Sequence, residues 1–153
     1  MIRVWRICKT VRAAAAWDGD GARRVSGRWN HRGVPIVYAS ATLSLAALEF
    51  LVHVDPDIAP SPLSALAAIL PERLAIETWD VESLPADWRG VPAPAALRDR
   101  GSAWAISSRT AVARAPSALI PGEWNYLLNP RHPDLKLIRF ENPIDFSFDP
   151  RLL

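Results

Sequence analysis

One segment of this chain has an unambiguous helical period, and any fold has to accommodate it. From Thr42 onward, apolar residues recur at intervals of three and four positions, and the Thr42 hydroxyl is suited to cap the first turn. The positions on this pattern are Leu43, Ala46, Ala47, Phe50, Leu51 and Val54. The sequence therefore predicts a helix here that is apolar on nearly every side.

The other segments are short and mostly of strand type. Residues 2–8 and 35–39 are rich in β-branched and aromatic side chains, and further strands are predicted at 75–81, 111–115, 135–140 and 145–148. A second helix is predicted at about 94–100. Residues 64–70 remain open between the two states, because their alanines favour a helix whereas their brevity and the following Pro71 favour a strand. This pattern predicts an α+β fold, a mixed sheet with few helices.

Length, hydropathy and charge restrict the class of protein. A chain of 153 residues, of which 50% are hydrophobic, suits one domain over residues 1–153. No apolar run approaches the roughly 20 residues of a membrane span, and the first ten residues lack the apolar stretch of a secretory signal. The single cysteine, Cys8, suits a reducing compartment, so we expect a cytoplasmic protein with no membrane association.

The formal net charge of +2 is far below the basic density of proteins that bind nucleic acid through its phosphates, so no direct nucleic-acid binding is expected. The three histidines, His31, His53 and His132, are too far apart in sequence to suggest a metal site, and none is assigned.

Basic residues and glycines gather in one early stretch, which we expect to be a functional loop over residues 17–33. The arginines in and before it are Arg12, Arg23, Arg24, Arg28 and Arg32, and the glycines are Gly19, Gly21, Gly27 and Gly33. This combination suits a small anionic ligand. The alternative is an ordinary solvated loop in which the arginines pair with surface carboxylates.

Three polar residues stand out within or beside the apolar segments. Glu49 lies inside the apolar helix, where a carboxylate has to be paired, protonated or used. Arg28 follows Gly27, a residue that lets the backbone approach a ligand closely, and its planar guanidinium suits phosphate or carboxylate. Tyr38 lies near the end of a predicted buried strand. Taken singly, each has an ordinary structural explanation: a buried ion pair, a surface arginine and a core tyrosine.

Ser117 follows Pro116 in a segment dense in Pro, Asn, Trp and Tyr, which indicates a tightly organised loop and a short element. The serine has no local base, so a Ser-His-Asp nucleophile would need His53 or His132 brought to it by the fold. Trp29 could stack on a planar ring, although tryptophans are more often core residues.

Taken together, these residues resemble the RES domain, a toxin family named for its arginine, glutamate and serine, and the similarity covers most of the chain. Three ordered blocks carry the resemblance. They are WDGDGARRVSGRWNHRGVPIVYAS, LAALEFLVH and RAPSALIPGEWNYLLNPRHPDL.

The resemblance implies roles for individual residues. It places the family's catalytic arginine, tyrosine, glutamate and serine at Arg28, Tyr38, Glu49 and Ser117. It also implies that the substrate is bound by several of these together with loop residues and a weaker candidate in the NPxHPD run. The implied binding residues are Gly27, Arg28, Trp29, Tyr38, Ser117 and Asn129.

The resemblance further implies a fold similar to the ADP-ribosyltransferase core and a type II toxin that depletes cellular NAD. NAD is the expected substrate, with water or inorganic phosphate as acceptor and no metal. The expected partner is an antitoxin with an Xre-type helix-turn-helix, in a hetero-oligomer. Two other functions stay open: an ADP-ribosyltransferase that modifies a host protein, and a non-catalytic module that only binds its partner.

Overall fold

The computed structural model describes residues 1–55, 57 and 61–153. Within them, eight strands form one sheet in the order β4-β5-β6-β2-β1-β3-β7, with β8 also paired to β3. The strands are β1 (Ile2–Lys9), β2 (Val37–Ser40), β3 (Leu63–Leu70), β4 (Ile76–Thr78), β5 (Val112–Pro116), β6 (Trp124–Leu128), β7 (Arg139–Phe140) and β8 (Ile144–Phe146). The pair β4 and β5 is parallel, and the other pairs are antiparallel. The predicted α+β class with a mixed sheet is confirmed.

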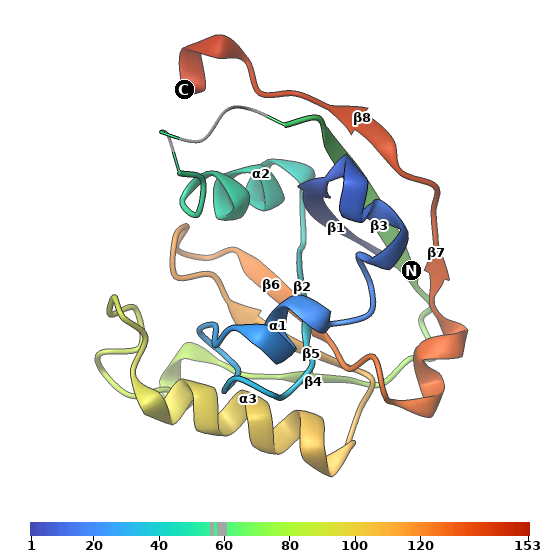
Figure 1. The fold of residues 1–153 in the computed structure, drawn as a ribbon. Helices are drawn as coiled ribbons and strands as arrows, with labels where there is room; N and C mark the ends of the chain where they lie inside the picture. Colours follow the sequence, from blue (N-terminus) through green and yellow to red (C-terminus); the bar gives the residue numbers. More distant parts are fainter. Residues whose placement is uncertain (56, 58–60) are drawn as a thin grey trace.

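Three α-helices accompany the sheet in the described residues: α1 (Asp20–Arg24), α2 (Leu43–Leu51) and α3 (Ala95–Ser107). Short 3-10 helices lie at η1 (Thr10–Ala15), η2 (Val81–Ser83), η3 (Pro133–Leu137) and η4 (Pro150–Leu152). Helix α2 lies against β1 and β2, whereas α3 lies at the opposite end of the molecule, beneath β4 and β5 (Figure 1). None of the described helices combines the length and apolar character needed to cross a bilayer.

Several predicted elements are confirmed. Helix α2 begins after Thr42, whose Oγ1 accepts a hydrogen bond from the Leu45 amide at 3.0 Å. The segment left open between helix and strand is the eight-residue strand β3, which is buried from Ser64 to Leu70. Its small alanines allow close packing on both faces of a central strand, and this packing outweighs their helix propensity.

Other predictions of secondary structure were wrong in part. The expected strand at 135–140 is reduced to β7, because Pro133 and the His132 side chain, which accepts from the Asp134 amide at 3.0 Å, start the 3-10 helix η3 instead. The expected loop at 17–33 contains the short helix α1. The second helix extends to Ser107 rather than ending near residue 100.

Strands β1 and β2 diverge near the middle of the sheet. Strand β1 pairs with β3 along its whole length, whereas its register with β2 consists of Trp5 opposite Ser40. Strand β2 pairs along its length with β6. The sheet therefore has two halves. One contains β3 and β1, and the other contains β2, β6, β5 and β4; the register position of Trp5 and Ser40 joins them.

Helix α3 is packed very closely against the loop that follows α1. A Cβ atom added at Gly101 would lie 1.8 Å from the Trp29 carbonyl oxygen, so only glycine allows this approach. The Ser102 hydroxyl accepts a hydrogen bond from the His31 amide at 2.9 Å. The Trp29 ring lies 5.0 Å from that of Trp79, which in turn meets Trp104 edge-on at 6.0 Å. This core fixes the loop in place.

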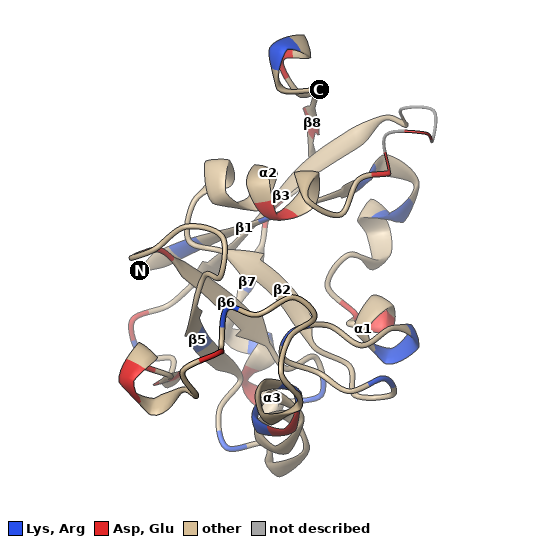
Figure 2. Cartoon of the chain, turned by 90° about the vertical axis from the view of Figure 1, so that its left-hand side faces the viewer, with Lys and Arg blue, Asp and Glu red and all other residues tan. Residues whose placement is uncertain are grey.

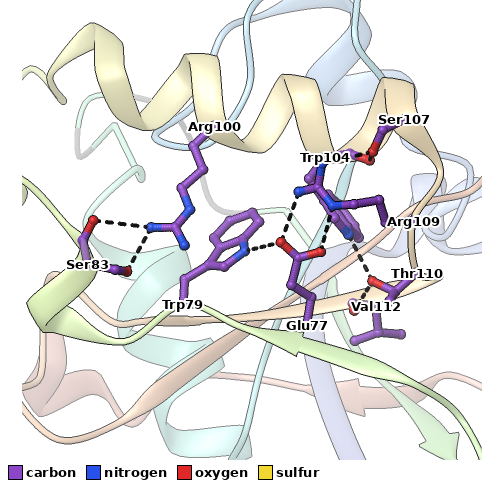
Figure 3. Close-up of polar contacts among 9 residues, drawn as sticks. All are labelled: Glu77, Trp79, Ser83, Arg100, Trp104, Ser107, Arg109, Thr110 and Val112. Atoms are coloured by element: carbon purple, nitrogen blue, oxygen red, sulfur yellow. Dashed lines mark hydrogen bonds and ion pairs between the residues drawn. The ribbon is translucent and has the colours of Figure 1, made fainter.

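A polar cluster fastens β4 to α3 (Figure 3). Glu77 accepts two hydrogen bonds from Arg109, at 3.0 and 2.9 Å, and one from the Trp79 indole at 2.9 Å. These contacts, the Arg109 bond foremost, hold the pKa of the Glu77 carboxyl below its usual value. Arg100 lies over the Trp79 ring at 5.1 Å and donates to the Ser83 hydroxyl at 2.8 Å.

Candidate active site

Glu49 and Ser117, which are 68 positions apart in the chain, are in direct contact. Helix α2 carries Glu49, and Ser117 directly follows β5. The Ser117 hydroxyl donates a hydrogen bond to Glu49 Oε1 at 3.1 Å, and the Asn125 side-chain amide donates to the same oxygen at 2.7 Å. Ser117 is 1% exposed, whereas Glu49 is partly exposed. The fold thus places a reachable carboxylate over the ends of β5 and β6.

The Ser117 hydroxyl is oriented by its own turn. Its oxygen accepts hydrogen bonds from the Leu119 and Ile120 amides at 3.1 and 3.2 Å, which aims its proton at Glu49. In the described part of the chain, no histidine hydrogen-bonds to Ser117, so the structure gives no support to a Ser-His-Asp nucleophile. The arrangement favours a serine that binds and orients.

Arg28 is held by backbone carbonyls. Its NH1 group donates to the carbonyl oxygens of Trp88 and Gly90 at 2.8 and 3.1 Å, and within the described residues it forms no ion pair. Burial lowers the pKa of Arg28, while the nearby negative charge of Glu49 acts in the opposite direction. The guanidinium therefore keeps a fixed place without an ion-pair partner in the described residues, within electrostatic reach of the Glu49 carboxylate.

The neighbouring arginines of the early loop behave differently. Arg23 and Arg24 both pair with Asp20 on α1, at 2.5 and 2.8 Å. Arg23 and Arg24 therefore fit the alternative explanation for this loop, in which arginines pair with surface carboxylates. Figure 2 shows the basic positions of η1 and α1 on the same side of the molecule.

Tyr38 joins the strand β2 to the loop that carries Arg28. Its hydroxyl donates to Asn30 Oδ1 at 2.5 Å and accepts from the Trp29 amide at 3.1 Å. Burial raises the pKa of the Tyr38 phenol well above its ordinary value, so this side chain stays neutral. A Cβ at Gly27 would lie 2.7 Å from the Tyr38 hydroxyl, so this glycine is required by the packing against tyrosine.

Two of the predicted binding residues lie apart from this group. The Trp29 indole is 2% exposed and packs in the core, so Trp29 reaches the site through its backbone amide. Asn129 is 1% exposed at the far end of β6, where its amide donates to the Ala105 carbonyl at 2.9 Å and its oxygen accepts from the Arg131 amide at 3.1 Å. Both hydrogen-bonding ends of Asn129 are used within the protein.

A cavity of about 490 Å³ opens where β1 and β2 diverge. Tyr38 and Gly27 line it together with the basic residues Arg6, Arg12 and Arg24, whereas Glu49, Ser117 and Arg28 do not. We take the cavity and the residues around Glu49 as neighbouring parts of one site. Tyr38 lines the cavity, and its hydroxyl holds the amide of Trp29, the residue after Arg28.

Arg6 is a candidate that sequence reasoning missed. Its NH1 group donates to the Tyr38 carbonyl at 2.8 Å across the gap between the two strands, while its buried Nε has no hydrogen-bond partner in the described residues. Burial lowers its pKa. One sequence feature could have indicated it: Arg6 is a charged residue that shares one face of the strand with Val4 and Cys8.

Asn125 was also missed, because the strand that carries it was not predicted. The described residues contain no group of three or more histidine, cysteine or acidic side chains arranged to hold a metal ion. What the site offers is one carboxylate, two cations without ion-pair partners, a neutral phenol and a hydroxyl. Such a set can bind an anionic ligand and place negative charge beside it.

Comparisons with known proteins show the family to which this chain is similar. The RES domain family model matches residues 3–149. The protein Toxin Res of Yersinia enterocolitica is 38% identical over 150 residues, which is 97% of this chain and 98% of that protein. The Prs ADP-ribosylating toxin of a Sphingobium species is 37% identical over 153 residues, covering 97% and 95% of the two chains.

A solved structure supports the fold. The toxin-antitoxin complex MbcT-MbcA of M. tuberculosis contains a chain that matches with a TM-score of 0.76 at 16% identity, over 95% of this chain and 84% of that one. The resemblance drawn from the sequence is confirmed by the family match and by relatives that are similar over nearly their whole length. This chain belongs to the RES domain family.

Proposed function

We propose that this protein is the toxin of a toxin-antitoxin system and that it depletes NAD by cleaving the bond between nicotinamide and ribose. One observation carries the proposal: Glu49 is held by hydrogen bonds from Ser117 and Asn125, within electrostatic reach of Arg28. The names of the relatives, Toxin Res and Prs ADP-ribosylating toxin, support the same class of activity.

The chemistry of this cleavage suits the residues present. Loss of nicotinamide leaves positive charge on the ribose in an oxocarbenium-like transition state, which a fixed carboxylate stabilises. Nicotinamide departs as a neutral base, so little acid catalysis is needed. Glu49 is the residue that would stabilise this charge and bind a ribose hydroxyl. Ser117 would help to position the ribose or the attacking group.

The cations suit the other end of the substrate. NAD carries a pyrophosphate, and Arg28 is the residue we expect to bind it through its remaining N–H groups. Arg6 supplies a second buried cation in the adjoining cavity, and Tyr38, which lines that cavity, would contact the nicotinamide side. Gly27 and Trp29 hold the loop. Asn129 uses both ends of its side-chain amide in hydrogen bonds within the protein, and these bonds do not support a role in binding NAD.

A second function keeps the same site but changes the acceptor. The name of the Sphingobium relative, an ADP-ribosylating toxin, favours transfer of ADP-ribose to a protein rather than to water or phosphate. A non-catalytic binding module is the third alternative. The presence of Arg28, Tyr38, Glu49 and Ser117 argues against it, since an inactive relative is expected to lose at least one of them.

A partner is part of the proposal. The matched M. tuberculosis structure is a toxin-antitoxin complex, which supports an antitoxin partner for this chain as well. We expect that partner to be of the Xre type and the complex to be a hetero-oligomer in the cytoplasm.

The test is to incubate the purified protein, freed of antitoxin, with NAD in buffers with and without inorganic phosphate and to measure nicotinamide release. Glu49→Gln is the informative variant, because it keeps an oxygen for Asn125 and Ser117 while it removes the charge. We expect release by the wild type and a loss of at least about 100-fold in this variant. Dependence on phosphate would distinguish phosphorolysis from hydrolysis.

The other outcomes decide between the alternatives. NAD consumption that requires added cell extract, with label from NAD recovered on a protein, would favour the transferase. If NAD survives under every condition while the folded protein still binds its antitoxin, the binding module is the correct function.

A further inference from the structure

Asn125, on β6, connects Ser40 of β2 with the Glu49 carboxylate. It lies on β6 directly opposite Ser40 of β2 in the register of the sheet, so the two side chains leave the same face as neighbours. The Ser40 hydroxyl donates to Asn125 Oδ1 at 2.9 Å, and Asn125 Nδ2 donates to Glu49 Oε1 at 2.7 Å. Ser40 is 3% exposed. A hydrogen-bonded chain therefore runs from the sheet to the carboxylate.

The orientation of the Asn125 amide follows from the chemistry of its neighbours. An ionised carboxylate only accepts hydrogen bonds, so the NH₂ group of Asn125 has to face Glu49. The amide oxygen then faces Ser40, whose hydroxyl is the donor it needs. A flipped amide would place two acceptors in contact at Glu49, which the short distance of 2.7 Å does not allow. Glu49 thus sets the direction in which the Asn125 amide donates, and Ser40 anchors the other end of that amide to β2.

The two oxygens of Glu49 are consequently different. Oε1 receives the hydrogen bonds of both Asn125 and Ser117, whereas no donor among residues 1–55, 57 and 61–153 reaches Oε2. Hydrogen bonds to a charged acceptor are about twice as strong as neutral ones, so this pair of donors restricts the rotation of the carboxylate. Oε2 is the oxygen left for a ligand.

We propose that Asn125 is a positioning residue for Glu49, anchored by Ser40, and that these hydrogen bonds turn Oε2 toward the ribose of the substrate. The proposal rests on the proposed function, because it assigns Glu49 to the ribose. The proposal extends that function by naming two residues, Ser40 and Asn125, that need not touch the substrate but determine how well Glu49 acts.

Steady-state kinetics with NAD test the proposal. Asn125→Asp keeps the shape of the side chain but replaces the donor by a second negative charge, which pushes the Glu49 carboxylate away. Asn125→Ala removes the amide, with its donor and its acceptor, and adds no charge. We expect kcat to fall on the order of 10- to 100-fold in Asn125→Ala and further in Asn125→Asp, while KM changes less than about threefold. A positioning role predicts this larger effect on kcat than on KM.

The Ser40 variants supply the matched control. Ser40→Ala removes the hydrogen bond that anchors the amide to β2 and is expected to lower kcat several-fold, whereas Ser40→Thr keeps a hydroxyl and is expected to retain most of it. Equal effects of both Ser40 variants, or a fall in kcat that disappears when the rate is normalised to the folded fraction, would show that these residues only support the fold. Full activity in Asn125→Ala would overturn the proposal directly.

A measurement without catalysis separates this proposal from the proposed function. The side-chain NH₂ of Asn125 gives a pair of resonances in a ¹H–¹⁵N NMR spectrum, which a hydrogen bond to a charged oxygen shifts downfield. We expect Glu49→Gln to move this pair upfield and Ser40→Ala to broaden it. If the shifts appear but the wild type leaves NAD intact, the proposed function fails and the hydrogen-bonded chain stands; if no shift appears in an active enzyme, the chain itself is refuted.

Discussion

Replacing Gly101 by alanine tests whether α3 holds the arginine loop in place. The added methyl would lie 1.8 Å from the Trp29 carbonyl oxygen and 2.7 Å from the carbonyl carbon. Real Cβ atoms essentially never come within 3.0 Å of another heavy atom, so α3 and the loop must part by about 1.2 Å. The obstacle is backbone rather than a flexible side chain, so it cannot rotate away. Trp29 is the immediate neighbour of Arg28, which has to move with it.

Two opposing effects set the size of the change. Alanine is favoured over glycine in the middle of a helix by about 1 kcal/mol. Overpacking of a closed interior costs about 1–3 kcal/mol, and a clash with backbone belongs at the upper end. The net expectation for Gly101→Ala is a loss of about 2 kcal/mol in the free energy of unfolding. For a chain of this length, that lowers the melting temperature by about 4–8 °C.

The expected loss of activity exceeds the loss of stability. A misplacement of about 1 Å in a positioning group can reduce the rate by about 100-fold. Urea unfolding gives the first quantity and nicotinamide release at 25 °C gives the second. Ala103→Gly, at an exposed position of the same helix, is the matched control: it should lose about 1 kcal/mol by helix propensity and keep its activity. A Gly101→Ala variant as stable and active as the wild type would refute the reasoning.

Three further predictions concern residues that do not contact Glu49. Asn129→Ala leaves the Ala105 carbonyl without its donor, so urea unfolding should show a loss of about 1–3 kcal/mol while the folded protein retains its kcat. Glu77→Gln should be less stable than the wild type by about 1 kcal/mol or less at pH 7. Because the hydrogen bonds of Arg109 lower the pKa of Glu77, this difference is present above about pH 4.3 and should vanish as the pH falls through the lower pKa of the folded state. Cys8 lies largely buried in the wall of the cavity and burial raises its pKa, so iodoacetamide at pH 7 should modify it more slowly in buffer than in urea; labelling at equal rates would contradict this.

The part of the site that the sequence predicts is local in origin. The position of Glu49 in an apolar helix is visible from the helical period alone, because a carboxylate in such a segment is conspicuous. Arg28 and Tyr38 are separated by ten positions, so a loop followed by a short strand brings them together without long-range information. The resemblance to the RES domain added Ser117, whose contact with Glu49 the structure then supplies.

The residues that sequence reasoning missed depend on pairings between distant segments. Strand β6 is short and lies between turns rich in glycine, proline and asparagine, so its pattern does not reveal that it is a central strand between β2 and β5. Asn125 becomes a candidate only once that register is known. Arg6 was inconspicuous for a similar reason: its Nε is buried because β1 and β2 diverge beside it, and no property of residues 2–9 indicates that divergence. The core position of the Trp29 ring could not be predicted either, because nothing in the loop sequence indicates that Gly101 of a later helix packs against the Trp29 backbone.

The separation of charge in the site is itself an argument for function. Glu49 and Arg28 attract each other, and a direct ion pair would be the simplest way to satisfy both. The structure instead gives each its own neutral partners: Asn125 and Ser117 hold the carboxylate, and two backbone carbonyls hold the guanidinium. Keeping opposite charges near each other but apart costs stability, because neither is neutralised. Such an arrangement is useful when a third body supplies the complementary charges, and a substrate with an anionic pyrophosphate and a ribose that becomes cationic in the transition state supplies both.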